Sequence, residues 1–557
     1  MKLKCLGIFL IIMLSETLSA QQFSKLSIPP AKKDMPSWAS FLYSKPINLY
    51  RIDSAYKVFY QSNPLVKNEY TRYFKRLRQL HRHTIDPKGN ILEPSMEFWA
   101  NRTGIAKKSR SAQVWNPIPM ETFWLANDQA QQDPCPWQVN IYAFDIAPSN
   151  HNILYVATET GGYFKTIDKG LHWTQIALND RLGSAEALVI HPTDPQKLWA
   201  SAGFNIYYSS DGGFNWTTQY TQSNLYGNSL QIDPSNPLHL VAGTEQGIFY
   251  TQNGGTTWTN SLPGTCSDVQ MHQANPQIVL ALQYNTVSDI FECWKSTNGG
   301  QTFQKSSTGW PIGVTDGRGR MTSSAADPNR FYALLLTDQG PRLLRSNNAG
   351  VSWITQATGE TTEMPLNNGQ GYYDLDIVAS PSDANQVIVA TTTAYKSING
   401  GSTFTAVGGY TGSFPIHPDI QEMHVAGGDS WIATDGGMSF STDFFANTAQ
   451  TSARNQGLNG SDLWGFDIGW SKDIAVGGRY HNGNTCWSEN YGGRFLRMGG
   501  AEAPTGYINP VENQKAYFSD LGGRILPKTF TDQAKYFPIG KWPNESYYTM
   551  ESGEMTW

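Results

Sequence analysis

One short phrase recurs along the chain and restricts the possible folds more than any other feature. The phrase reads Ser/Thr-x-Asp/Asn-x-Gly-x-x-Trp/Phe, and its clearest copy runs from Ser209 to Trp216. An eighth, degenerate copy at Asp443 lacks the glycine and the aromatic residue. Neighbouring copies are 42 to 51 residues apart, a period typical of four-stranded repeats arranged as a propeller. The acid or amide of the seven good copies stands at Asp168, Asp211, Asn253, Asn298, Asn348, Asn399 and Asn490.

The chemistry of the phrase is that of a tight β-turn. Asp and Asn accept hydrogen bonds from the amides of their own turn, and Ser and Thr do so more weakly. Glycine supplies the positive φ that such a turn needs. We therefore interpret the seven acid or amide side chains as structural residues without a ligand role.

The segments between the copies complete a four-stranded unit. Each unit opens with a strand and a proline turn, such as His191-Pro192, and then has a second strand, a third strand that enters the phrase, and a fourth strand. The sequence predicts an all-β, multi-bladed β-propeller over residues 115–557, a segment long enough for about nine to ten blades. A single ring and a seven-bladed ring to about residue 455 plus part of a second ring both fit. We favour the second arrangement because the phrase degenerates at Asp443.

The first 114 residues have a different character. Residues 1–20 combine Lys2 and Lys4 with a short apolar run and a small-residue site before Gln21, which is typical of a signal peptide. Residues 21–114 carry two apolar stripes with helical spacing, which predicts a small, mainly helical region. The mature protein is expected to be secreted or on the outer cell surface, with no integral membrane segment after cleavage.

Composition argues against some partners but does not decide how the cysteines pair. A net charge of −5 gives no electrostatic case for nucleic acid. Neither a cofactor nor a metal is predicted, because the histidine and cysteine spacings match no known zinc signature. Four cysteines remain after residue 20, and four allow three pairings. We prefer Cys266 with Cys293, since both fall within one unit.

Topology indicates where a ligand would bind. If the strands of a unit are named A to D, the A–B and C–D turns share one face of an antiparallel propeller, and the B–C and D–A loops share the other. The stereotyped turns occupy the first face, so the B–C/D–A face is the candidate binding face. Four of its B–C loops have an acid close to a glycine. Such an acid can stabilise the turn itself, or its carboxylate can face a ligand. These acids are Glu159, Glu245, Asp435 and Asp520.

Other polar side chains on this part of the chain are candidates for ligand contact. The guanidinium groups of Arg318 and Arg320 suit carboxylates. Three histidines and one aspartate in the later part of the chain are candidates either for ligand binding or for structural hydrogen bonds. They are His417, Asp419, His424 and His481.

Residues 140 to about 525 resemble the exported Asp-box propellers of Bacteroidetes, described as neuraminidase-repeat (BNR) or sortilin-like proteins. The resemblance rests on the repeated phrase, on Gly369–Leu375 and on Thr434-Asp435-Gly436-Gly437. It implies type IX secretion cargo, and so the export machinery as a partner. The family often has Gln-Asp-Asn-Gly where this chain has residues 480–483, Tyr-His-Asn-Gly. The expected carboxyl-terminal sorting domain is not recognisable, so the chain reads as a fragment or a divergent member.

Two functions follow as hypotheses. The favoured one is a recognition protein that binds an extracellular glycan, peptide or protein on the B–C/D–A face. The alternative is a glycoside hydrolase of xyloglucanase-like or sialidase-like type, which needs two carboxylates roughly 5–10 Å apart. Glu159 and Asp435 would be its catalytic residues, and Glu159 falls where xyloglucanases place a catalytic Asp. No sialidase arginine triad is evident, and we lean towards a protein that is not an enzyme.

Overall fold

The computed structural model divides the chain into two compact units, residues 26–119 and residues 1–25 with 120–557. The predicted signal peptide lies outside the residues that the structure describes. Those residues are 28–29, 31–66, 68–81, 85–91, 122–124, 135, 137–177, 182–285, 288, 290–311, 318–337, 340–359, 364–366, 370–469, 471–500, 506–509 and 512–536.

The smaller unit is helical, as the two apolar stripes predict. It contains the 3₁₀ helix η2 (Ser37–Tyr43) and the helices α2 (Leu49–Tyr60) and α3 (Glu69–His81). The Asn48 side chain caps α2 by accepting a hydrogen bond from the Arg51 amide. The core of this unit is aromatic, with Trp38 packed against Tyr56 and Phe74. No described helix is long and apolar enough to cross a membrane.

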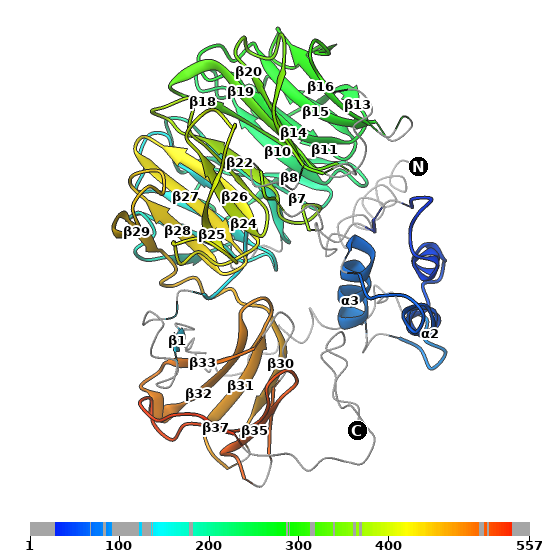
Figure 1. Ribbon diagram of the computed structural model, residues 1–557, viewed down its shortest axis with the longest axis vertical. Coiled ribbons are helices and arrows are strands. Elements are labelled where there is room, and N and C mark those ends of the chain that lie inside the picture. The colour runs from blue at the N-terminus through cyan, green and yellow to red at the C-terminus, as the bar shows by residue number, and fades with distance from the viewer. Residues whose placement is uncertain are drawn as a thin grey trace, which may run out of the picture. The chain divides into compact units, whose positions relative to one another are not determined.

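The larger unit is a β-propeller, which confirms the predicted fold class. Seven four-stranded antiparallel sheets follow one another between residues 141 and 453, and we call them blades 1 to 7 (Figure 1, cyan to yellow). The innermost strand of each blade contacts that of the next, and the innermost strand of blade 7 contacts that of blade 1. The seven blades therefore form a closed ring.

Blades 1 to 4 contain β2 (Ile141–Ile146), β3 (Leu154–Thr158), β4 (Tyr163–Thr166), β5 (Thr174–Ile176), β6 (Ala185–Ile190), β7 (Leu198–Ala202), β8 (Asn205–Ser209), β9 (Thr217–Thr221), β10 (Gly227–Ile232), β11 (Leu240–Thr244), β12 (Gly247–Thr251), β13 (Thr259–Pro263), β14 (Cys266–Met271), β15 (Val279–Asn285), β16 (Ile290–Ser296) and β17 (Gln304–Lys305). Blades 5 to 7 contain β18 (Gly319–Ser324), β19 (Asp327–Leu335), β20 (Arg342–Ser346), β21 (Ile354–Thr358), β22 (Asp376–Ala379), β23 (Val387–Ala390), β24 (Thr393–Ser397), β25 (Thr405–Gly409), β26 (Ile420–Ala426), β27 (Asp429–Thr434), β28 (Gly437–Ser441) and, after the 3₁₀ helix η3 (Thr448–Gln450), β29 (Thr451–Ala453).

Polar side chains on the innermost strands link the blades around the ring. At six of the seven junctions a side-chain oxygen of one innermost strand accepts the backbone amide at or beside the next. The last of these bonds joins blade 7 to blade 1 and so helps to close the ring. The acceptor and donor residues are Asp145 and Ile190, Ser229 and Val269, Asp268 and Met321, Thr322 and Ala379, Asp376 and Met423, and Glu422 and Phe144.

The repeated phrase forms the C–D turn of blades 1 to 6 with the same hydrogen bonds each time. In blade 2, Ser209 Oγ accepts the Gly213 amide at 2.9 Å and Asp211 Oδ1 accepts the Asn215 amide at 3.0 Å. The Gly212 amide donates to the carbonyl of Gln196 in the proline turn of the same blade. The A–B and C–D turns therefore lie on one face, and the B–C and D–A loops lie on the other.

Two more sheets follow blade 7 (Figure 1, orange to red). The first is five-stranded and contains β1 (Thr122–Trp124), which pairs in parallel with β33, together with β30 (Leu463–Ile468), β31 (Ile474–Arg479), β32 (Gly483–Ser488) and β33 (Phe495–Gly499). The second contains β34 (Gly506–Ile508), β35 (Lys515–Phe518), β36 (Gly522–Ile525) and β37 (Lys535–Tyr536). The phrase copy at Asn490 contains the 3₁₀ helix η4 (Glu489–Tyr491), capped by Ser488.

The preferred disulfide between Cys266 and Cys293 is wrong, because both residues are free thiols. Cys266 on β14 pairs with Gln283 on β15, and Cys293 on β16 pairs with Leu282. The strand β15 thus lies between the two cysteines. Two strand spacings amount to about 9–10 Å, which exceeds the Cα separation that a disulfide spans. Cys135 and Cys486 are also buried.

Candidate functional site

The tip of the hairpin that joins β31 to β32 contacts the B–C/D–A face of the ring. We call residues 480–482 the hairpin tip. The Asn482 side-chain amide donates to the carbonyl of Asp435 in the B–C loop of blade 7, at 2.8 Å. Beside the tip, a guanidinium nitrogen of the fully buried Arg479 lies 3.4 Å from the Gln138 carbonyl ahead of blade 1. A segment from outside the seven blades therefore covers the junction of blades 7 and 1.

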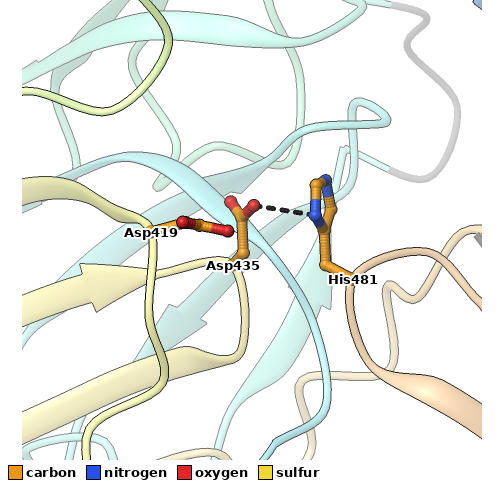
Figure 2. A group of neighbouring side chains, drawn as sticks. All are labelled: Asp419, Asp435 and His481. Carbon is orange, nitrogen blue, oxygen red and sulfur yellow. Dashed lines mark ion pairs between the residues drawn. The ribbon is translucent and has the colours of Figure 1, made fainter. Parts of the chain in front are cut away.

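His481 of the hairpin tip lies between the two carboxylates that the sequence singled out as a pair. Its Nδ1 is 2.9 Å from Asp435 Oδ2, and its Nε2 is 3.5 Å from Glu159 Oε2. The side chains are 1% exposed for His481, 0% for Asp435 and 4% for Glu159. Figure 2 shows the contact between His481 and Asp435 and the position of Asp419 beside them. The B–C loops of blades 1 and 7 and the hairpin tip thus bring together two acids and a histidine that are far apart in the sequence.

Asp435 is held by donors from two other elements. The Tyr373 hydroxyl, in the loop before β22, lies 2.9 Å from Asp435 Oδ1, and Gln421 Nε2 on β26 lies 2.8 Å from the same oxygen. Asp419 lies directly behind, where its carbonyl accepts the Asp435 amide and its Oδ1 accepts Gln370 Nε2 at 2.8 Å. Every one of these side chains is buried, so the site is rigidly positioned by hydrogen bonds.

Local sequence explains why these loops approach so closely. Asp419 and His481 both have left-handed backbones, with φ of 66° and 63°. Gly436 follows Asp435 because the His417 ring packs against its backbone, and a Cβ there would lie 2.5 Å from the ring. Burial lowers the pKa of His417 to about 4. His417 is therefore neutral at physiological pH and acts as a packing residue.

Three of the remaining candidates lie on the same face in other blades. Arg318 comes just before the inner strand β18, Arg320 is near the start of β18, and Glu245 is in the B–C loop of blade 3. One Arg318 nitrogen donates to the Tyr373 carbonyl at 2.8 Å, and burial lowers the pKa of this guanidinium to about 10. Arg320 donates to backbone carbonyls of blades 3 and 4. Burial raises the pKa of Glu245, which accepts a hydrogen bond from Asn228. These groups sit where the inner strands begin, beside the site.

The other two candidates, His424 and Asp520, do not belong to the site around Asp435 and His481. His424 lies 3.1 Å from Glu422; burial opposes its charge, but the neighbouring carboxylates raise its pKa to about 9. It belongs with the acids that link the blades. Asp520 accepts Asn484 Nδ2 at 2.7 Å within the two sheets after blade 7. Asp520 thus stabilises a hairpin of those sheets.

Sequence reasoning missed Tyr373, Gln370 and Gln421, which bind the acids directly. Tyr373 falls inside the segment 369–375 that carries part of the family resemblance, and this was the available signal for it. Gln421 is buried on the inner strand β26, a position where an amide needs a partner.

The donor set of the site fits a metal ion, which the sequence did not predict. One ligand atom each of Asp419, Asp435 and His481 lies within 4.8 Å of the others, and all three residues are buried.

Comparisons with known proteins support the fold and leave the activity open. No family model and no curated protein matches the chain. An ancestral GH74 enzyme is similar, with a TM-score of 0.51 and 15% identity over 68% of this chain and 54% of that one. The GH74 xyloglucanase from Xanthomonas campestris has a TM-score of 0.49 and 13% identity over 72% and 73% of the two chains. YCF48 bound to D1 peptide has a TM-score of 0.40 and 15% identity over 59% and 98%. The chain spans about half the length of the ancestral GH74 enzyme, and the likeness shows a shared propeller fold.

Proposed function

We propose that this protein is a secreted or cell-surface recognition propeller that binds a glycan or peptide on the B–C/D–A face. The observation that carries the proposal is the position of His481 between Glu159 and Asp435. A glycosidase needs the scissile bond between its two carboxylates. Here an imidazole takes that place, and both acids are buried. The hydrolase alternative therefore requires the hairpin tip to leave.

Ligand contact is better placed beside the covered acids, where the inner strands begin. Arg318, Arg320, Glu186 and Glu245 are all partly exposed there. The charges of Arg320 and Glu186 both act on Arg318, so groups of both signs lie close together. Such a mixed surface suits a ligand with many neutral donors and acceptors, as glycans and peptides have.

The signal peptide predicted at residues 1–20 supports export, and the resemblance to Asp-box, sortilin-like Bacteroidetes propellers supports type IX cargo. The export proposal has a direct test. Mass spectrometry of the native protein is expected to find Gln21 at the amino terminus, and retention of Met1 would contradict export by cleavage.

The binding proposal is tested with a panel of polysaccharides and peptides, scored for binding and for new reducing ends. Arg318→Gln and Glu245→Gln are expected to weaken binding about tenfold or more, since each removes a charged group at the proposed contact. Asp211→Asn in a C–D turn is the matched control and should bind as the wild type does. No new reducing ends are expected.

The same panel tests the hydrolase alternative. Turnover by the wild type that disappears in both Glu159→Gln and Asp435→Asn, with binding retained, would establish a hydrolase and refute the recognition proposal. Equal binding by wild type, Arg318→Gln and Glu245→Gln would remove the proposed contact surface.

A further inference from the structure

We propose that Asp419, Asp435 and His481 bind a divalent transition-metal cation, of the Zn²⁺ or Mn²⁺ class, that fastens the hairpin tip to the ring. The inference goes beyond the proposed recognition function and does not depend on it.

The spacing of the ligand atoms fits one ion. Zinc bonds to imidazole nitrogen and carboxylate oxygen are about 2.0–2.2 Å long, so neighbouring ligands of one ion lie about 3 Å apart. His481 Nδ1 and Asp435 Oδ2 are 2.9 Å apart. The ligand atoms of all three residues lie within 4.8 Å of one another, and Figure 2 shows the carboxylates of Asp419 and Asp435 side by side. A small displacement of these side chains is enough to close on an ion.

The chemistry of the donors selects the kind of ion. An imidazole nitrogen suits zinc and other first-row transition ions, whereas calcium and magnesium take oxygen ligands. Two carboxylates with one imidazole therefore favour Zn²⁺ or Mn²⁺ over Ca²⁺.

The surroundings resemble the outer shell of a metal site. A metal-bound histidine usually donates its other ring N–H to a carboxylate, which fixes the ring. Nε2 of His481 faces Glu159 in this way, at 3.5 Å. The Tyr373 hydroxyl and the Gln421 amide likewise hold Asp435, and Gln370 holds Asp419. Glu159 is then a positioning residue for His481.

An independent observation at the hairpin tip points to a missing partner. The Asn482 side-chain nitrogen donates to the carbonyls of Asp435 and Tyr480, which fixes the orientation of the amide. Its oxygen, in a residue only 1% exposed, has no hydrogen-bond partner within the described part of the chain. A buried acceptor without a donor is costly, and water carried by an ion supplies a donor.

Electrostatics favours the same conclusion. The carboxylates of Asp435 and Glu159 face the two ring nitrogens of His481, and a ligand atom of Asp419 lies within 4.8 Å of those of Asp435 and His481. Carboxylates brought together in a buried site repel one another. A divalent cation relieves this repulsion. The ligands come from the loop before β26, the β27–β28 loop and the hairpin tip, so an ion joins three separate segments.

The experiment uses the full-length protein, stripped with EDTA and dialysed. Zn²⁺ and Mn²⁺ are titrated by calorimetry, bound metal is counted by elemental analysis, and Tm is measured with and without metal. We expect one ion per chain and a Tm that rises by several degrees on adding it. Asp419→Asn and His481→Gln should each lower affinity at least tenfold, and Glu159→Gln should lower it less.

Asp233→Asn is the matched control. Asp233 and His239 form another buried acid–histidine pair, 3.3 Å apart, without a second carboxylate at that site among the described residues. This variant should bind metal as the wild type does. If Asp419→Asn or His481→Gln does not fold, as judged by near-ultraviolet circular dichroism, the wild-type stoichiometry and Tm decide. Wild type that binds neither ion, or variants that bind like wild type, would overturn the proposal.

Discussion

The C–D turns and the site under the hairpin tip use the same residue types in opposite ways. In a turn such as that of blade 2, Asp211 binds the amide and side chain of Asn215, four residues away. At the site, Asp435 binds His481, 46 positions later, and Tyr373, 62 positions earlier. The turn is complete within one segment, whereas the site exists only when the ring and the hairpin tip have both formed. An acid before glycine therefore has no fixed role until its distant partners are known.

The largest expected effect comes from breaking the buried site. Asp435→Ala leaves the Tyr373 hydroxyl and the Gln421 amide without their shared acceptor, and it removes the carboxylate that lies 2.9 Å from His481 Nδ1. We expect a loss of about 3–5 kcal/mol in the free energy of unfolding, since the removal of this carboxylate leaves two buried donors unsatisfied and a cavity beside His481. Urea unfolding of wild type and variant measures this value. A loss below about 1 kcal/mol would show that the site is no more coupled than a turn.

A pH effect should come next in size. Burial raises the pKa of Asp376 to about 7, although its Oδ2 accepts the Met423 amide. A carboxyl with a raised folded-state pKa binds more protons when folded, so its contribution to stability is greatest below about pH 4 and falls as pH rises to 7. Asp376→Asn keeps an acceptor oxygen and removes the charge. Thermal unfolding should show a gain of about 2–4 kcal/mol at pH 8 and little change at pH 4. Equal effects at both pH values would contradict this account.

The C–D turns should show a smaller effect of the opposite sign. Hydrogen bonds from His172 and Thr166 lower the pKa of Asp168 to about 2, even though its partial burial opposes this. Its stabilising contribution is therefore present above about pH 4 and is lost as pH falls towards 2. Asp168→Asn should lose less stability than wild type between pH 4 and 2. If wild type and Asp168→Asn lost the same stability between pH 4 and 2, the lowered pKa of Asp168 would be refuted.

The smallest effect is expected from an exposed turn without a titrating group. Asn348→Ala removes the acceptor of the Ser352 amide, which the turn of blade 5 uses at 2.9 Å. Asn348 Oδ1 also accepts the Val351 amide, and its Nδ2 donates to Ser352 Oγ. Because water can replace these exposed bonds, we expect a loss of only about 1 kcal/mol. Urea midpoints measure it, and the degenerate turn at Asp443, which keeps its Ser441 bonds, supplies a comparison.

Sequence predicted the fold because the information for a blade is local. The phrase, with its Ser or Thr, its acid or amide and its glycine, recurs in blades 1 to 6, and the side-chain hydrogen bonds within it span four residues or fewer. The site was only partly predictable. Glu159 and Asp435 were recognisable as a pair of acids on one face, but nothing near either residue shows that His481 comes between them. Tyr373 and Gln370 contribute from the loop before β22, which meets the acids only when blades 6 and 7 have packed together. The disulfide prediction failed for a similar reason, because a shared blade does not make β14 and β16 adjacent.

The central claim is that the hairpin tip covers the paired acids through His481. A double-mutant cycle between His481→Gln and Asp435→Asn, measured by urea unfolding of the full-length protein, tests it most directly. Contacting residues in one hydrogen-bond network couple by about 0.5–3 kcal/mol, and we expect at least 1 kcal/mol here. Additivity of the two single changes within about 0.3 kcal/mol would mean that His481 and Asp435 act independently, and the account of a covered site would be wrong.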